Sequence, residues 1–77
     1  MDLRIGIAKS NNVIELELED GTDRGELKAQ IGQALADEHQ ILWLTDRKGK
    51  ELAIPSSRIS FVELGAVDAE RRIGFGV

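Results

Sequence analysis

The sequence has 77 residues, with no cysteine, one proline and one histidine, and its formal net charge is −4. Because domains rarely fall below ~50 residues, residues 1–77 are predicted to form one small domain. A hydrophobic content of 42% and a charged content of 31% exclude a disordered chain, and the cysteine count excludes a disulfide scaffold or cysteine-ligated zinc. No apolar run approaches the ~20 residues of a membrane span. We therefore expect a soluble cytoplasmic domain without membrane association.

Two alternating segments open the chain. In residues 3–8, large aliphatic side chains occupy every second position, which predicts a strand with one buried face. Residues 13–19 alternate in the same way and carry three glutamates on the opposite face, namely Glu15, Glu17 and Glu19. Residues 10–12, between the two segments, are turn formers. Together these segments predict a β-hairpin.

A helix is predicted to follow the hairpin. Asp23 and Glu26 have the spacing of a capping box, with Thr22 as the alternative cap. The helix is expected to run to about residue 37. Its apolar side chains fall on one stripe, formed by Leu27, Ile31, Ala34 and Leu35.

A second pair of strands is predicted after the helix. Residues 40–45 are apolar and β-prone, and residues 46–50 form a polar turn. Residues 51–54 form the returning strand, which Pro55 ends because proline has no N–H for the ladder.

The last part of the chain contains a short helical turn and one more strand. Residues 56–58 fit a single helical turn capped by Ser56 or Ser57, and residues 59–64 form a strand with apolar side chains on both faces. In residues 65–77, three large apolar side chains alternate with glycines. This pattern favours an ordered segment with a short sixth strand over a solvated tail.

The predicted order is β-β-α-β-β-β, which indicates the α+β class. One mixed sheet with one helix packed on it is the natural architecture for this order, and the β-grasp, or ubiquitin-like, arrangement is favoured. Small Sm-like barrels use related strand counts, but there the helix normally comes first.

Two stretches resemble a known family of small actinobacterial proteins, domain of unknown function 3107. They are residues 54–65, IPSSRISFVELG, and residues 71–77, RRIGFGV, and the likeness extends over essentially the whole chain. The resemblance implies an intracellular protein of Gram-positive, high-GC bacteria and offers no established site residues. Some family members carry an ATP-binding label, but the sequence contains no glycine-rich phosphate-binding motif that would support it.

No set of residues indicates catalysis, a metal site or a cofactor. His39 follows Asp37 and Glu38 at the predicted helix end, where an exposed position is expected. The serines lack a histidine partner for nucleophilic catalysis, and metal binding would need more nitrogen or sulfur ligands. The glutamates of residues 13–19 are expected to form a solvated face. We therefore expect that the protein is not an enzyme.

An apolar patch is the main candidate site. Ile41 and Trp43 lie on the strand face opposite Leu42 and Leu44, and exposed apolar patches mark interaction sites. The C-terminal segment covers this patch in the alternative interpretation. The candidate set is Ile41, Trp43, Val62, Leu64, Arg71, Arg72 and Phe75.

These observations favour a non-catalytic protein-interaction or adaptor module. A structural homodimer is one alternative. A weak nucleotide or nucleic-acid binder is the other, with candidate phosphate contacts at Arg47, Lys48 and Lys50. The negative net charge argues against nucleic acid as a partner.

Overall fold

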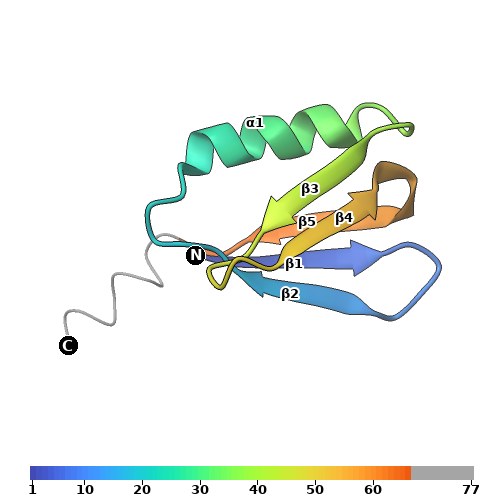
Figure 1. Cartoon of the computed structure of the whole chain (residues 1–77). Coiled ribbons are helices and arrows are strands. Elements are labelled where there is room, and N and C mark those ends of the chain that lie inside the picture. Colours follow the sequence, from blue (N-terminus) through green and yellow to red (C-terminus); the bar gives the residue numbers. More distant parts are fainter. Residues whose placement is uncertain (67–77) are drawn as a thin grey trace.

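A computed structural model describes residues 1–66 and has the predicted order of elements (Figure 1). The α+β class is thereby confirmed. The predicted sixth strand lies outside the described residues. The elements are β1 (Asp2–Ile7), β2 (Val13–Glu17), α1 (Arg24–Leu35), β3 (Ile41–Thr45), β4 (Glu51–Pro55), the 3-10 turn η1 (Ser56–Arg58) and β5 (Ile59–Leu64).

The first sheet has three strands in the order β2-β1-β5, and both pairs are antiparallel. Leu3 lies opposite Leu16 on one side and Leu64 on the other, and these side chains share the inner face. The register shifts between Gly6 and Ile7, next to the β1–β2 turn. β1 is therefore the central strand. Its pairing with β5 makes the first and last strands of the described chain hydrogen-bonded neighbours.

The second sheet is the antiparallel pair β3–β4. This arrangement corrects the single mixed sheet expected from the sequence, because the described strands form two separate ladders and contain no parallel pair. Strands with one apolar face can bury that face against a second sheet as well as beneath a helix. The alternating pattern is the same in both cases. The β-grasp arrangement stays a prediction.

The core lies between the two sheets and the helix. Leu3 and Ile5 of β1 are 0% exposed, and Leu42 of β3 is 1% exposed. The other buried apolar side chains come from β2, the segment after it, α1, β3 and β4. They are Leu16, Leu18, Leu27, Ile31, Ala34, Leu44 and Ile54.

Helix α1 begins where the capping pattern predicted. The Asp23 side chain accepts a hydrogen bond from the backbone N–H of Glu26 at 2.9 Å, which satisfies one of the free donors at the helix start. The helix ends at Leu35, before residue 37, and its buried residues Leu27, Ile31 and Ala34 confirm the predicted stripe. Leu35 is half-exposed, so it belongs to the edge of that stripe.

The turn η1 occupies the predicted residues, but its serines do not cap it. Pro55 is the N-cap and makes no side-chain hydrogen bond. The buried Ser56 hydroxyl instead donates to the backbone carbonyl of Ala34 at 2.5 Å, and the Ser56 N–H donates to the carbonyl of Gln40 at 2.9 Å. Ser56 therefore joins η1 to the end of α1 and to the start of β3.

Candidate interaction surface

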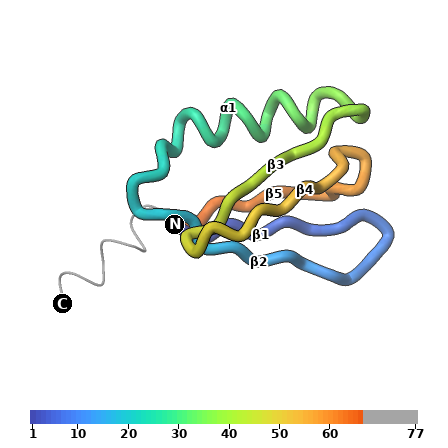
Figure 2. Tube along the Cα trace, in the orientation of Figure 1, coloured from blue at the N-terminus to red at the C-terminus, as the bar shows by residue number. Residues whose placement is uncertain are grey.

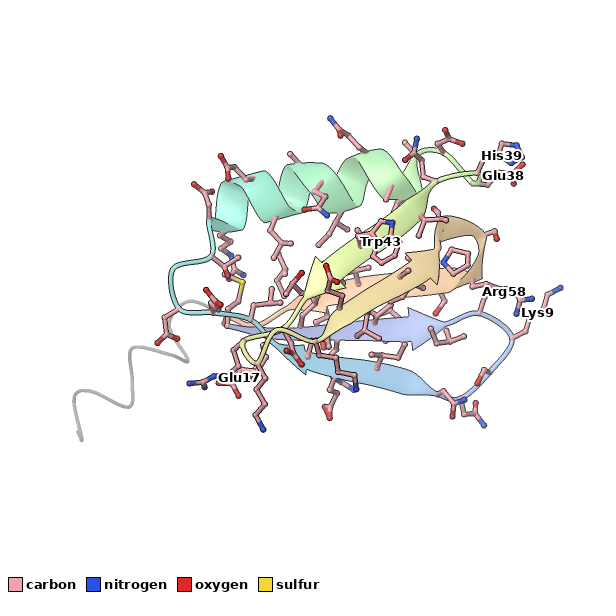
Figure 3. All side chains as sticks on the ribbon, in the orientation of Figure 1. Lys9, Glu17, Glu38, His39, Trp43 and Arg58 are labelled. Atoms are coloured by element: carbon pink, nitrogen blue, oxygen red, sulfur yellow. The ribbon has the colours of Figure 1, made fainter. Side chains whose placement is uncertain are left out.

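The outer face of the β3–β4 pair carries apolar side chains. Along β3, burial alternates so that Leu42 and Leu44 point into the core and Ile41 and Trp43 point out. Ile41 is 50% exposed and Trp43 is 58% exposed. Figure 3 shows Trp43 projecting from β3 away from the core. This alternation confirms that Ile41 and Trp43 lie on the strand face opposite Leu42 and Leu44. The C-terminal segment that was the alternative cover for this face lies, from residue 67 on, outside the described residues.

Two apolar residues of β4 extend this surface. Pro55 lies opposite Ile41 and Ala53 lies opposite Trp43 in the antiparallel register, and both are exposed. Side chains directly opposite each other in such a pair have Cβ atoms ≈4.5–5.5 Å apart. We call these four residues, Ile41, Trp43, Ala53 and Pro55, the β3–β4 patch.

The β3–β4 patch lies on a well-supported strand pair. On the inner face, Leu42 is opposite Ile54, and both are buried in the core. At the edge of β3, the side-chain amide of Gln30 on α1 donates to the carbonyl of Trp43 at 2.8 Å. The helix therefore holds the backbone beneath Trp43 in place while the indole stays accessible.

Acidic side chains stand at both ends of the β3–β4 patch. At one end, Glu51 lies opposite Thr45, on the same outward face as Ala53. At the other end, Glu38 and His39 lie in the loop just before β3, and their side chains are 79% and 87% exposed. The patch therefore combines an apolar centre with a glutamate at each end of its rim.

A family model matches residues 1–76, and its description is "Protein of unknown function (DUF3107)". The chain belongs to the DUF3107 family. The match extends over the whole of both sheets and α1. A search among curated proteins found no match to this sequence.

In this DUF3107 protein, Val62 and Leu64 do not join Ile41 and Trp43. Val62 lies opposite Ile5, and Leu64 opposite Leu3, so both face the interior side of the first sheet. With α1 they line a separate apolar groove, formed by Lys28, Ile31, Gly32, Leu35, Val62 and Leu64. The predicted set therefore divides over two surfaces. Arg71, Arg72 and Phe75 lie outside the described residues.

The predicted phosphate contacts lie at the β3–β4 turn. Arg47 is already engaged, because its guanidinium lies 2.8 Å from a carboxylate oxygen of Glu17 on β2. The carboxylate of Asp46 accepts hydrogen bonds from the backbone N–H groups of Lys48 and Lys50, which shapes the turn. Between residues 1 and 66, these two lysine side chains form no ion pair.

The described part of the DUF3107 protein contains no group of three potential metal ligands. None of its helices is long and apolar enough to cross a membrane. His39 is exposed, as predicted, but it lies in the loop before β3 because α1 ends at Leu35; the Ser56 hydroxyl is hydrogen-bonded to the carbonyl of Ala34. Arg4 lies between two glutamates on the outer face of the first sheet, 2.9 Å from Glu63 and 3.8 Å from Glu15.

The sequence analysis missed Ala53 and Pro55 as part of the surface. The alternation of Ala53 and Pro55 with the inward-facing Leu52 and Ile54 indicates that the first two face outward. The register that places Ala53 and Pro55 beside Trp43 and Ile41 comes only from the structure. It also missed Phe61, which is 44% exposed on the outer face of the first sheet, with its ring against Gly6.

Proposed function

We propose that this protein is a non-catalytic, cytoplasmic protein-interaction module and that the β3–β4 patch is its docking surface. The observation that carries this proposal is the exposure of Trp43, 58%, beside Ile41, 50%, on a strand whose other face is buried. Tryptophan is enriched among the residues that dominate binding energy at interfaces, and contiguous exposed apolar residues mark such interfaces.

The rim favours a partner with positively charged side chains. Glu51 and Glu38 flank the apolar centre at its two ends, and the whole chain has a net charge of −4. Complementary charges around an apolar centre steer association and suppress wrong partners. The partner is therefore a protein segment that places an apolar anchor on Trp43 and basic side chains beside the two glutamates.

The same rim argues against self-association through this face. In a two-fold pair each copy contributes the same surface, so Glu38 and Glu51 of one copy are brought toward the same glutamates of the other in either orientation. Like charges brought together at an interface are unfavourable. The structural homodimer suggested by the sequence is thus the weaker candidate for the β3–β4 patch.

The test compares two exposed aromatic residues that belong to different sheets. Trp43→Ser removes the centre of the β3–β4 patch, and Phe61→Ser is the matched control. Proteins from the native cytoplasm are captured on each immobilised variant, and the captured partner is then purified and titrated by calorimetry. We expect wild type and Phe61→Ser to bind it alike, and Trp43→Ser to bind about 30-fold more weakly or worse, as for a hot-spot residue worth ~2 kcal/mol.

A further variant and a change of salt concentration test the role of the glutamates in the same experiment. Glu51→Lys should weaken the purified complex, and higher salt should weaken the wild-type complex more than the Glu51→Lys complex. Equal affinities for Trp43→Ser and Phe61→Ser would contradict the proposal. Sedimentation is run on the free chain, and a dimer that Trp43→Ser abolishes would assign the patch to a second copy instead.

A further inference from the structure

A second surface lies at the end of the molecule where two turns meet. The β1–β2 turn and η1 are side by side there, at the end away from the β3–β4 turn (Figure 2). The backbone N–H of Ala8 donates to the carbonyl of Arg58 at 2.7 Å, which joins the two segments. Between them is a cleft of about 520 Å³, within the range of small-molecule sites. Its polar lining consists of Lys9, Ser10, Asn12, Ser57 and Arg58.

The charge at this cleft is positive, although the chain is acidic overall. Lys9 and Arg58 project from the same end of the molecule (Figure 3). Within residues 1–66, neither forms an ion pair, whereas Arg4 and Arg47 are both paired with glutamates. No acidic residue occurs in residues 8–12 or in residues 56–58. Two cations therefore face one cleft without a carboxylate to neutralise them.

The backbone at Lys9 adds an independent observation. Its φ is 59°, and among the described non-glycine residues it is the one with a positive φ. This left-handed conformation suits glycine or asparagine better than lysine. Strained residues of this kind cluster at ligand sites, where the side chain has a use. Two asparagines, which suit this conformation better than lysine does, lie within three positions of Lys9. The left-handed position is nevertheless occupied by the lysine.

We propose that this cleft binds a small phosphorylated ligand through its phosphate group. The Arg58 guanidinium can donate two parallel hydrogen bonds to phosphate oxygens, and the Lys9 ammonium supplies a second cation. The Ser10 hydroxyl oxygen accepts from the backbone N–H of Asn12 at 3.0 Å, so its proton is available for a ligand oxygen. The Ser57 hydroxyl is a further donor from the opposite wall of the cleft.

The lining also limits what else is recognised. No aromatic side chain lines the cleft, so a nucleobase would have no stacking partner among the described residues. Recognition through phosphate alone predicts that ATP and inorganic tripolyphosphate bind with similar affinity. This site is independent of the β3–β4 patch, and either can fail without the other.

The test is a titration of backbone amide chemical shifts at constant ionic strength, with inorganic phosphate, tripolyphosphate and ATP as probes. We expect saturable shifts confined to residues 8–12 and 56–58. Lys9→Gly suits the left-handed backbone and removes one cation, and Arg58→Gln removes the other. Each should weaken binding on the order of tenfold, as for the loss of a charged hydrogen bond. Lys48→Gln, at the opposite end of the molecule, is the control and should leave the affinity unchanged.

Three results would overturn the proposal. The first is the absence of localised shifts with any of the three probes. The second is an equal loss of affinity in Lys48→Gln and Lys9→Gly, which would show diffuse attraction to surface lysines. The third is binding of ATP without binding of tripolyphosphate, which would show that the base and not the phosphate is recognised.

Discussion

The hydrogen bond from Ser56 to Ala34 gives a quantitative test of how the helix is joined to the sheets. Ser56 is the one buried polar residue of the described core, and its hydroxyl donates to the Ala34 carbonyl at 2.5 Å. Ser56→Ala removes this donor and little volume. The carbonyl of Ala34 keeps another partner, because the backbone N–H of Asp37 also donates to it at 3.3 Å.

The expected loss is therefore that of one hydrogen bond without an orphaned acceptor. Such a bond contributes about 1 kcal/mol net to the free energy of unfolding. With an unfolding entropy of ~2.1 cal/mol/K per residue, a chain of 77 residues loses about 6 °C in melting temperature for each kcal/mol. Ser57→Ala is the matched control, because Ser57 is exposed and the described contacts give its hydroxyl no partner. Its free energy of unfolding should stay within about 0.5 kcal/mol of wild type.

The assay is urea unfolding followed by far-ultraviolet circular dichroism, with a thermal scan as the second measure. If Ser56→Ala unfolds at the same urea concentration as Ser57→Ala, the bond does not join α1 to η1 in solution. A loss above about 3 kcal/mol would also refute the reasoning, because it would mean that the Ala34 carbonyl is left without a partner.

Three further perturbations test the fold by the same unfolding assay. Asp23→Ala should lower the free energy of unfolding by about 1 kcal/mol, because it removes the N-cap of α1. Asp23→Ser should keep most of the wild-type free energy of unfolding, and equal losses in both variants would rule out capping. Leu3→Ala should lower the free energy of unfolding by about 3 kcal/mol or more, because this side chain is fully buried. Leu35→Ala, at the half-exposed edge of the helix, should lower it much less, and similar losses in the two variants would contradict the described core. Gly6→Ala should destabilise the protein because its Cβ would collide with the Phe61 ring, and much of the loss should vanish in the Phe61→Ala background. Additive losses in that double mutant would show that the ring does not lie over Gly6.

The local elements could be predicted from the sequence because their signals are local. The apolar, β-prone residues 59–64 predicted the bounds of β5 to the residue, and the spacing of Asp23 and Glu26 predicted the start of α1. A capping hydrogen bond and an alternating strand depend on near neighbours in the chain, so the sequence alone contains them.

The pairing of the two sheets could not be predicted in this way. Alternation divides a strand into two faces but does not say which other strand each face meets. Val62 and Leu64 were therefore placed beside Trp43, although the register sets them opposite Ile5 and Leu3 on the inner face. The cleft between Lys9 and Arg58 was missed for a related reason, because residues far apart in sequence meet there through one backbone hydrogen bond.

The β3–β4 patch is the centre of this account, and one measurement addresses it directly. The chain has a single tryptophan, so incorporation of 5-fluorotryptophan gives one fluorine resonance that reports only on position 43. In the free protein we predict a resonance that shifts between H₂O and D₂O, as expected for an indole that is 58% exposed. On saturation with the purified partner, the resonance should move and lose that solvent dependence. A resonance without solvent dependence in the free protein, or one that the bound partner leaves unchanged, would contradict the account.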